Sequence, residues 1–349
     1  MRTGQGSDAI LHGMLTNDMH RQAKLKDAAS VAGVAVPAEF DDVVAWVAWL
    51  YYVDELTQSD IAAALSVSRA TIVKLLQDAR ERGAVTIRIN QEAASRTGLS
   101  RALAAKFELA AAHVLPHLSG APLTRRLGEA GARVLAQELR TGDTVGVAWG
   151  RTVLAVAEKM SAPYESGPYT VVQVCGSSAG SAVEFSPELC SSILASRIKA
   201  RCANLLAPAV LSTTMLREQL LAEPPLVNQF ALIRSANRVL FGVGDVAGAA
   251  TVRAAEMASG EEIDAYVKRG AVGVLIGRFI DSDGRHMIGD LDGRMIGITL
   301  DELKAMPNRL CVAGGPEKIQ ALRAALRGGY ITHLVTDADA ATALLEASD

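Results

Sequence analysis

A run of polar and basic residues between positions 57 and 80 could contact DNA. Two short amphipathic helices around a turn at residues 66–68 are predicted there, typical of a helix-turn-helix, which places its second helix in the major groove. Arg and Gln can each pair with a base edge through two hydrogen bonds, and Lys and Thr can contact bases or phosphates. The candidate DNA contacts are Thr57, Gln58, Ser68, Arg69, Ala70, Thr71, Lys74, Gln77 and Arg80.

Apolar residues in the same stretch decide which helix face stays free. The four that recur at the spacing of one buried face are Ile72, Leu75, Leu76 and Ala79. Thr57, three residues before Asp60, predicts a capping box at the start of the first helix. Ser68 can cap the second helix, and Gly83 can end it in a left-handed conformation. The opposite face of the second helix is therefore predicted to meet DNA.

Charge indicates a local rather than a general affinity for nucleic acid. The 349-residue chain has a formal net charge of −3, and residues 41–90 hold five basic residues against seven acidic ones. The basic residues all lie on the second of these helices or after it: Arg69, Lys74, Arg80, Arg82 and Arg88. The last three would lie beside phosphates, which supply most of the salt-sensitive affinity. A three-helix unit can also be a protein-interaction module, and such an adaptor would show salt-insensitive partner binding and no affinity for DNA.

Four loops rich in glycine and small polar residues form a second group of candidates. Each follows a predicted strand, and glycine there lets backbone N–H groups approach a phosphate near a helix N-terminus. Arg151 and Lys318 would add positive charge, and Asp245 could accept hydrogen bonds from sugar hydroxyls. The candidate effector contacts are Gly150, Arg151, Thr152, Gly176, Ser177, Ser178, Gly242, Gly244, Asp245, Gly314, Gly315 and Lys318. None of the loops matches a GxGxxG or Walker motif, so a dinucleotide site is not expected.

Short apolar strands alternating with helices must position these loops. The predicted strands span residues 144–149, 170–175, 204–207, 238–243, 310–313 and 333–336. This alternation predicts a doubly wound, mostly parallel α/β sheet with helices on both faces, and ligands bind such a sheet beyond the carboxyl ends of its strands. The pair Asp283–Gly284 predicts a hairpin in a small insertion.

Periodicity and composition divide the chain into parts. Residues 1–40 are predicted to be an N-terminal extension, and residues 41–90 a mainly α-helical winged helix-turn-helix whose wing is a strand at 84–89. Residues 91–112 are predicted to form a linker helix. Residues 113–349 are predicted to be the effector-binding domain, to which the family resemblance described below also assigns oligomerisation.

Catalytic and metal-binding patterns are missing from the sequence. The six histidines show no ligand spacing, and Ser177 and Ser178 lack a GxSxG elbow. Four acids are interpreted as part of a solvated hairpin, because their spacing is not that of an EF-hand: Asp281, Asp283, Asp290 and Asp292. No catalytic residue, metal or cofactor is therefore predicted.

The cysteines and the apolar segments indicate the compartment. The four cysteines contain no CxxC pair, and buried, reduced thiols are expected because Cys175, Cys202 and Cys311 lie in or beside apolar segments. No apolar run approaches the roughly 18 residues of a membrane span. The N-terminus lacks the pattern of a signal peptide. A cytoplasmic protein without a membrane partner is expected.

Motifs spread over residues 41–347 resemble the SorC-type family of bacterial transcription regulators, which carry a sugar-binding domain. They include LTQSDIA at 56–62, SVSRAT at 66–71, VGVAWGRT at 145–152 and IGRFIDSDG at 276–284. The likeness continues through the AGG at 313–315 with Lys318 and the VTD at 335–337. Two features depart from the family pattern: about 40 residues precede the helix-turn-helix, and the loop at 176–180 reads GSSAG where relatives often carry more glycine.

The resemblance implies a function. Such regulators have a C-terminal domain similar to glucosamine-6-phosphate deaminase and ribose-5-phosphate isomerase, which senses phosphorylated sugars or polyols rather than converting them. They assemble as tetramers, as dimers of dimers, on paired sites in double-stranded operator DNA. The implied protein is not an enzyme but a DNA-binding regulator of a carbohydrate or polyol catabolic operon, with Lys318 as the expected phosphate contact. The alternative is an isomerase- or deaminase-like enzyme with an accessory helical module.

Overall fold

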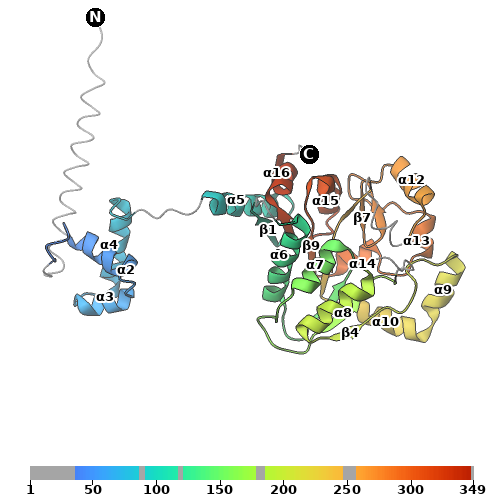
Figure 1. Ribbon diagram of the computed structural model, residues 1–349, viewed down its shortest axis with the longest axis horizontal. Helices are drawn as coiled ribbons and strands as arrows, with labels where there is room; N and C mark the ends of the chain where they lie inside the picture. Colours follow the sequence, from blue (N-terminus) through green and yellow to red (C-terminus); the bar gives the residue numbers. More distant parts are fainter. Residues whose placement is uncertain (1–35, 86–90, 117–120, 178–184, 247–256, 347–349) are drawn as a thin grey trace, which may run out of the picture. The chain divides into compact units, whose positions relative to one another are not determined.

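The chain divides between residues 89 and 90 into two compact units, each with its own hydrophobic core. A computed structural model describes residues 36–85, 91–116, 121–177, 185–246 and 257–346 (Figure 1). No helix in these ranges is long and apolar enough to cross a membrane.

The described part of the first unit contains the helices α2 (Val43–Tyr52), α3 (Gln58–Ala64) and α4 (Arg69–Glu81). Side chains cap all of them: Asp42 accepts from the Ala45 N–H at 2.8 Å, and Thr57 and Asp60 form the predicted capping box. Ser68 caps α4, and Gly83 follows its end with φ +74°. These N-caps satisfy N–H groups that have no partner within the helix, so the predicted helix starts are confirmed.

The core of the first unit is the predicted apolar face. Ile72, Leu75, Leu76 and Ala79 are buried, and they pack with Val47 and Ile61. Residues 84 and 85 are bends, and residues 86–90 of the predicted wing strand lie outside the described residues. The arrangement of α3 and α4 around a short turn is that of a helix-turn-helix.

The second unit begins with α5 (Gln91–Lys106) and is built on a seven-stranded parallel sheet (Figure 1). Its spatial order is β1 (Ala111–Leu115), β10 (His333–Asp337), β9 (Asn308–Val312), β5 (Arg238–Phe241), β2 (Thr144–Val147), β3 (Thr170–Gln173) and β4 (Arg201–Ala203). All neighbouring pairs run parallel. The predicted doubly wound α/β class is confirmed.

Helices cover both faces of this sheet. The chain moves from β2 outward to β3 through α7 (Arg151–Lys159), but from β9 toward the other edge to β10 through α15 (Ile319–Arg327). Because parallel crossovers are right-handed, opposite directions place these helices on opposite faces. The other helices of the unit are α6 (Leu123–Glu138), α8 (Pro187–Ile198), α9 (Thr214–Ala222), α10 (Pro224–Arg234), α12 (Gly260–Lys268), α13 (Asp290–Arg294), α14 (Leu300–Ala305) and α16 (Ala338–Glu346).

A small antiparallel sheet joins β6 (Gly244–Asp245), β7 (Gly273–Leu275) and β8 (Arg278–Ile280), and all three strands escaped prediction. Its hairpin turns at Ile276 and Gly277, both with positive φ, as a tight two-residue turn requires. Asp283–Gly284 lies in a second hairpin after β8, as predicted: the Gly284 N–H donates to the Asp281 carbonyl at 3.0 Å, and Ile280 pairs antiparallel with His286.

Three sequence expectations about this unit need correction. The predicted strand at 204–207 is wrong: β4 ends at Ala203, the Leu205 N–H donates to the Gln173 side chain instead of a strand, and Leu206 is 85% exposed. The predicted linker helix at 91–112 ends too late, because α5 ends at Lys106 and the strand β1, which was not predicted, begins at Ala111. Among the cysteines, Cys202 is exposed, whereas the other three are buried thiols.

Candidate DNA-reading surface and effector site

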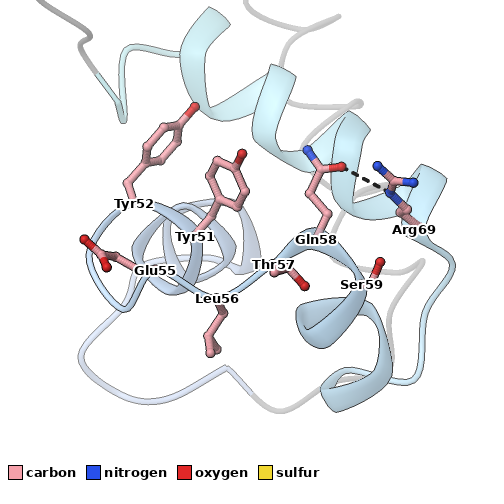
Figure 2. A pocket seen from close by; sticks show the side chains of 8 residues that line it. All are labelled: Tyr51, Tyr52, Glu55, Leu56, Thr57, Gln58, Ser59 and Arg69. Carbon is pink, nitrogen blue, oxygen red and sulfur yellow. Dashed lines mark hydrogen bonds between the residues drawn. The ribbon is translucent and has the colours of Figure 1, made fainter. Parts of the chain in front are cut away.

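The predicted DNA contacts lie together on the free face of α4 and at the start of α3. Ser68, Arg69, Ala70, Lys74, Gln77 and Arg80 are exposed, as is Thr57, while Gln58 and Thr71 are half-buried. The Arg69 Nε atom lies 3.4 Å from Gln58 Oε1 and donates to it, so α3 orients the first basic residue of α4 (Figure 2). The hydrogen bond is exposed and therefore easily exchanged for a base or phosphate.

A hollow of about 560 Å³ borders this surface. Tyr51 and Tyr52, from the end of α2, lie on one side of it, and Gln58 and Arg69 lie on the other (Figure 2). Its full lining is Tyr51, Tyr52, Glu55, Leu56, Thr57, Gln58, Ser59 and Arg69. Sequence reasoning missed the two tyrosines, although their position just before the capping box of α3 places them at the same surface.

Some predicted contacts already have partners in the protein. Arg82, expected beside phosphates, lies 3.4 Å from the Asp42 carboxylate and 3.9 Å from Asp78, so it fastens the end of α4 to the start of α2. The Thr57 hydroxyl donates to Asp60 at 2.6 Å. Arg88 lies outside the described residues. The remaining exposed cations of α4 are better placed than Arg82 to meet DNA.

The predicted effector loops follow strands that are neighbours in space. They come after β9, β5, β2 and β3, which stand in that order in the sheet. The chain turns to opposite sides after β2 and after β5, which makes this pair of strands a topological switch point. Ligands of doubly wound sheets bind in the crevice at such a point, beyond the carboxyl ends of the strands.

The loop after β2 presents charge above a helix start. Gly150 has φ +123° and is the N-cap residue of α7, Arg151 is exposed, and Thr152 is buried. The Arg151 guanidinium lies 5.4 Å from the centre of the Phe185 ring. Burial raises the pKa of the Cys190 thiol to about 12, partly offset by a hydrogen bond from the Gly150 backbone. The backbone of the loop therefore contacts the neutral Cys190 thiol, and its positive charge, on Arg151, is exposed.

The loop after β3 is bound into the protein more tightly than its glycine suggests. The Gly176 N–H donates to the Ile296 carbonyl at 2.9 Å, and the Ser177 N–H donates to the Ala207 carbonyl at 2.8 Å. A Cβ atom on Gly176 would lie 2.6 Å from the Ala209 Cα, so the close approach of two backbones requires glycine. These two N–H groups are thus already used within the fold, and Ser178 lies outside the described residues.

The loop after β5 enters the small sheet. Gly242 follows β5 directly, and Gly244 and Asp245 form β6, which pairs with Val274 and Gly273 of β7. This pairing fixes the backbone of the loop that carries Asp245. The small sheet is therefore part of the wall beside the predicted effector site.

The loop after β9 is held by a buried carboxylate that sequence reasoning did not single out. Asp337, at the end of β10, accepts from the Gly315 N–H at 2.8 Å and from the Ala340 N–H at 3.0 Å. Gly315 has φ +97°, and a Cβ atom on Gly314 would lie 2.2 Å from the Asp337 carboxylate. Both glycines are therefore required by the turn itself.

Lys318 follows this turn and is half-buried. Burial raises the pKa of the Cys311 thiol to about 12, and the positive charge of Lys318 opposes that rise. Lys318 ends the short 3-10 turn Pro316–Lys318 that follows β9, so its backbone lies beyond the carboxyl end of that strand. Lys318 has no ion-pair partner among the described residues.

The predicted solvated hairpin is present around Asp281 and Asp283, closed by the antiparallel bridge between Ile280 and His286, but the assignment of Asp292 to it is wrong. Asp283 is exposed and pairs with Arg285 at 2.7 Å, but the Asp292 side chain is only 9% exposed and lies 2.9 Å from Arg278. Burial raises the pKa of Asp292, but hydrogen bonds from His286, Tyr266 and the Gly289 N–H outweigh it and lower that pKa to about 2. The described residues contain no group of His, Cys, Asp and Glu able to hold a metal ion.

Comparisons with known proteins agree on one family. Residues 91–346 match the family model of a sugar-binding domain. The transcriptional regulator YjhU of Escherichia coli (strain K12) is 34% identical over 316 residues, which cover 87% of this chain and 94% of that protein. A deoxyribonucleoside regulator of Bacillus subtilis (strain 168) is 31% identical, over 85% of this chain and 95% of that protein.

A solved structure shares the architecture of most of the chain. The full-length sorbitol operon regulator SorC from Klebsiella pneumoniae superimposes with a TM-score of 0.68 at 27% identity, covering 90% of this chain and 100% of that one. The relatives are named as transcriptional regulators rather than as enzymes.

The turn after β9 yields a stability prediction. Gly314→Ala should displace the Asp337 carboxylate and lower the free energy of unfolding by about 1–3 kcal/mol, because Gly315 loses its hydrogen-bond acceptor. Gly98→Ala is the matched control: it lies in α5 with open space around it, and it should be neutral or stabilising by up to about 1 kcal/mol. Urea unfolding of both variants measures this, and equal stabilities would show that Gly314 is not required.

Proposed function

The chain belongs to the SorC-type family of transcriptional regulators with a sugar-binding domain, and from this we propose that it controls a carbohydrate or polyol catabolic operon in response to a phosphorylated sugar or polyol. The observation that carries the proposal is the pairing of two surfaces in one chain. One unit exposes the polar and basic face of α4, and the other gathers four loops at the switch point of a parallel sheet.

The DNA-binding role rests on α4. Its N-terminus is capped by Ser68, and Arg69, Lys74 and Arg80 are all exposed on the helix. We infer that the N-terminal residues of α4 contact base edges, while Lys74, Arg80 and the start of α3 contact phosphates. A single helix-turn-helix unit makes few contacts with DNA. We therefore propose that operator binding depends on two or more copies of the chain that act together on paired half-sites.

The effector role rests on charge at the carboxyl ends of β2 and β9. Lys318 lies near the end of β9, and Arg151 begins the helix after β2, so both could neutralise a phosphate bound between the loops. The backbone of Asp245 is held in β6 of the small sheet, and we propose that its carboxylate accepts from sugar hydroxyls. The proposed site therefore recognises an anionic group and a polyol together.

An enzymatic role has less support from the described residues. His333 begins β10 and so lies at the amino end of the sheet, opposite the loops, and His286 contacts Asp292 at 2.7 Å. Asp337 lies at the correct end, but both of its oxygens accept backbone N–H groups. These two histidines and Asp337 are therefore not placed to act as a general base in the proposed site, and Asp245 is assigned to the sugar hydroxyls. We propose a cytoplasmic, oligomeric sensor rather than an isomerase or deaminase.

A ligand screen tests the effector role. Thermal unfolding is measured with pentose, hexose and polyol phosphates and with the same compounds lacking phosphate. At least one phosphorylated compound should raise the midpoint, since a ligand that binds only the folded state stabilises it. The unphosphorylated partner should not, and neither compound should be converted. Turnover of a sugar phosphate would contradict the sensor and support the enzyme; no stabilisation by any compound would contradict the effector class.

Arg69 tests the DNA-binding face. Arg69→Ala should weaken binding to a specific operator fragment by about 1–3 kcal/mol, because a bidentate base contact is lost. Arg125→Ala removes one exposed arginine from α6 of the other unit and should leave operator binding unchanged. Fluorescence anisotropy with the upstream region of the chain's own gene measures both. Equal affinity of the Arg69 variant and the control would place base recognition elsewhere.

Lys318 tests the effector site. Lys318→Ala should abolish most of the stabilisation by the phosphorylated ligand, because one full charge near the proposed phosphate is removed, while operator affinity without ligand is retained. Lys268→Ala, an exposed lysine at the end of α12, is the control and should respond to ligand like the unaltered chain. An unchanged ligand response in the Lys318 variant would exclude this side chain from the site.

A further inference from the structure

A buried charge cluster lies between the small sheet and α13. The Asp292 carboxylate accepts from Arg278 Nη1 and from the Tyr266 hydroxyl, each at 2.9 Å. It also contacts His286 Nε2 at 2.7 Å and accepts from the Gly289 N–H at 2.9 Å. The Arg278 and Asp292 side chains are 3% and 9% exposed. The cluster is thus shielded from solvent, and every contact of the carboxylate comes from β8, α12 or the segment between β8 and α13.

Arg278 extends the cluster to the loop after β3. Its Nε atom donates to the Ile298 carbonyl at 2.9 Å. The segment 295–298 then runs along the carboxyl end of β3: the Ile298 N–H donates to the Val174 carbonyl, and the Ile296 carbonyl accepts from the Gly176 N–H, both at 2.9 Å. One guanidinium therefore holds the segment to which the loop after β3 is hydrogen-bonded.

The same arginine is fixed to the loop after β5. Arg278 is the first residue of β8, which pairs with β7 through Leu275. In turn β7 pairs with Gly244 and Asp245 of β6. A continuous chain of backbone and side-chain hydrogen bonds thus runs from Asp245, through the small sheet and Arg278, to Ile298 and Gly176. It joins two loops that flank the proposed site.

Stability alone is a weak reason for this arrangement. A buried ion pair loses the hydration of both charges, and replacing such a pair by apolar residues is often neutral or stabilising. Here the Arg278 Nη2 atom is also buried without a hydrogen-bond partner in the described structure, which adds a cost. The pair does fix an orientation. The planar guanidinium of Arg278 holds the Ile298 carbonyl and the Asp292 carboxylate in one relative geometry.

We propose that Arg278 and Asp292 are positioning residues that set the spacing between residues 174–177, which follow β3, and residues 242–246, which follow β5. Neither touches the effector; they act through Ile298 and through the small sheet. The spacing of the two loops then limits the size of phosphorylated sugar that fits between them. That last consequence rests on the proposed function, whereas the mechanical link between the loops does not require any ligand.

Amide hydrogen exchange of the full chain, without ligand, tests the link. Asp292→Asn keeps the size of the side chain but removes its charge and one acceptor. Peptides covering 172–177 and 295–298, together with those of β6 and β7, should exchange at least about tenfold faster than in the unaltered chain. The control is Asp283→Asn, which breaks the exposed pair with Arg285 in the neighbouring turn and should change neither loop.

Two outcomes would overturn the proposal. Faster exchange confined to 286–294 would show that the pair acts only locally. Faster exchange throughout the second unit, β10 and α16 included, would show a role in stability alone. If Asp292→Asn does not fold, Tyr266→Phe removes one donor to the same carboxylate and takes its place. Because the test uses neither DNA nor effector, a failure of the regulator hypothesis would leave its result intact.

Discussion

The order of strands in the parallel sheet is the constraint on which the proposed sensor depends. The carboxyl ends of all strands in the central sheet lie on the same side. The order β9, β5, β2, β3 brings loops from distant parts of the sequence to neighbouring positions there. The reversal of direction between β2 and β5 opens the place where a small ligand can enter. The positive charge proposed for that place comes from Arg151 and Lys318, which both belong to the second unit.

Backbone N–H groups of these loops donate hydrogen bonds within the fold, and these bonds hold the loops in place. Asp337 fixes the turn at Gly315, the segment 295–298 fixes Gly176, and β7 fixes Gly244. An effector that moved one loop would therefore disturb a segment elsewhere in the sheet. When each loop is hydrogen-bonded to a distant segment in this way, ligand binding at the loops can favour one conformation of the whole unit over another.

Local features were predictable from the sequence, and distant contacts were not. The caps at Thr57 and Ser68 depend on residues three positions away, so pattern alone located α3 and α4. The apolar run at 204–207 has the composition of a strand. The local sequence does not show that the Leu205 N–H is bonded to the distant Gln173 side chain. Asp292 was mistaken for a solvated acid because its partners Tyr266 and Arg278 are distant in the chain, and β6 to β8 are too short to show a period.

A regulator of the proposed kind must couple effector binding to operator binding, and reciprocal titrations measure this coupling. Operator affinity is determined with and without a saturating phosphorylated sugar, and the affinity for that sugar is determined with and without operator. Both affinities should change by the same factor, of roughly 5–150-fold, because coupling free energy is reciprocal. Tight binding of both ligands with no mutual effect would contradict it.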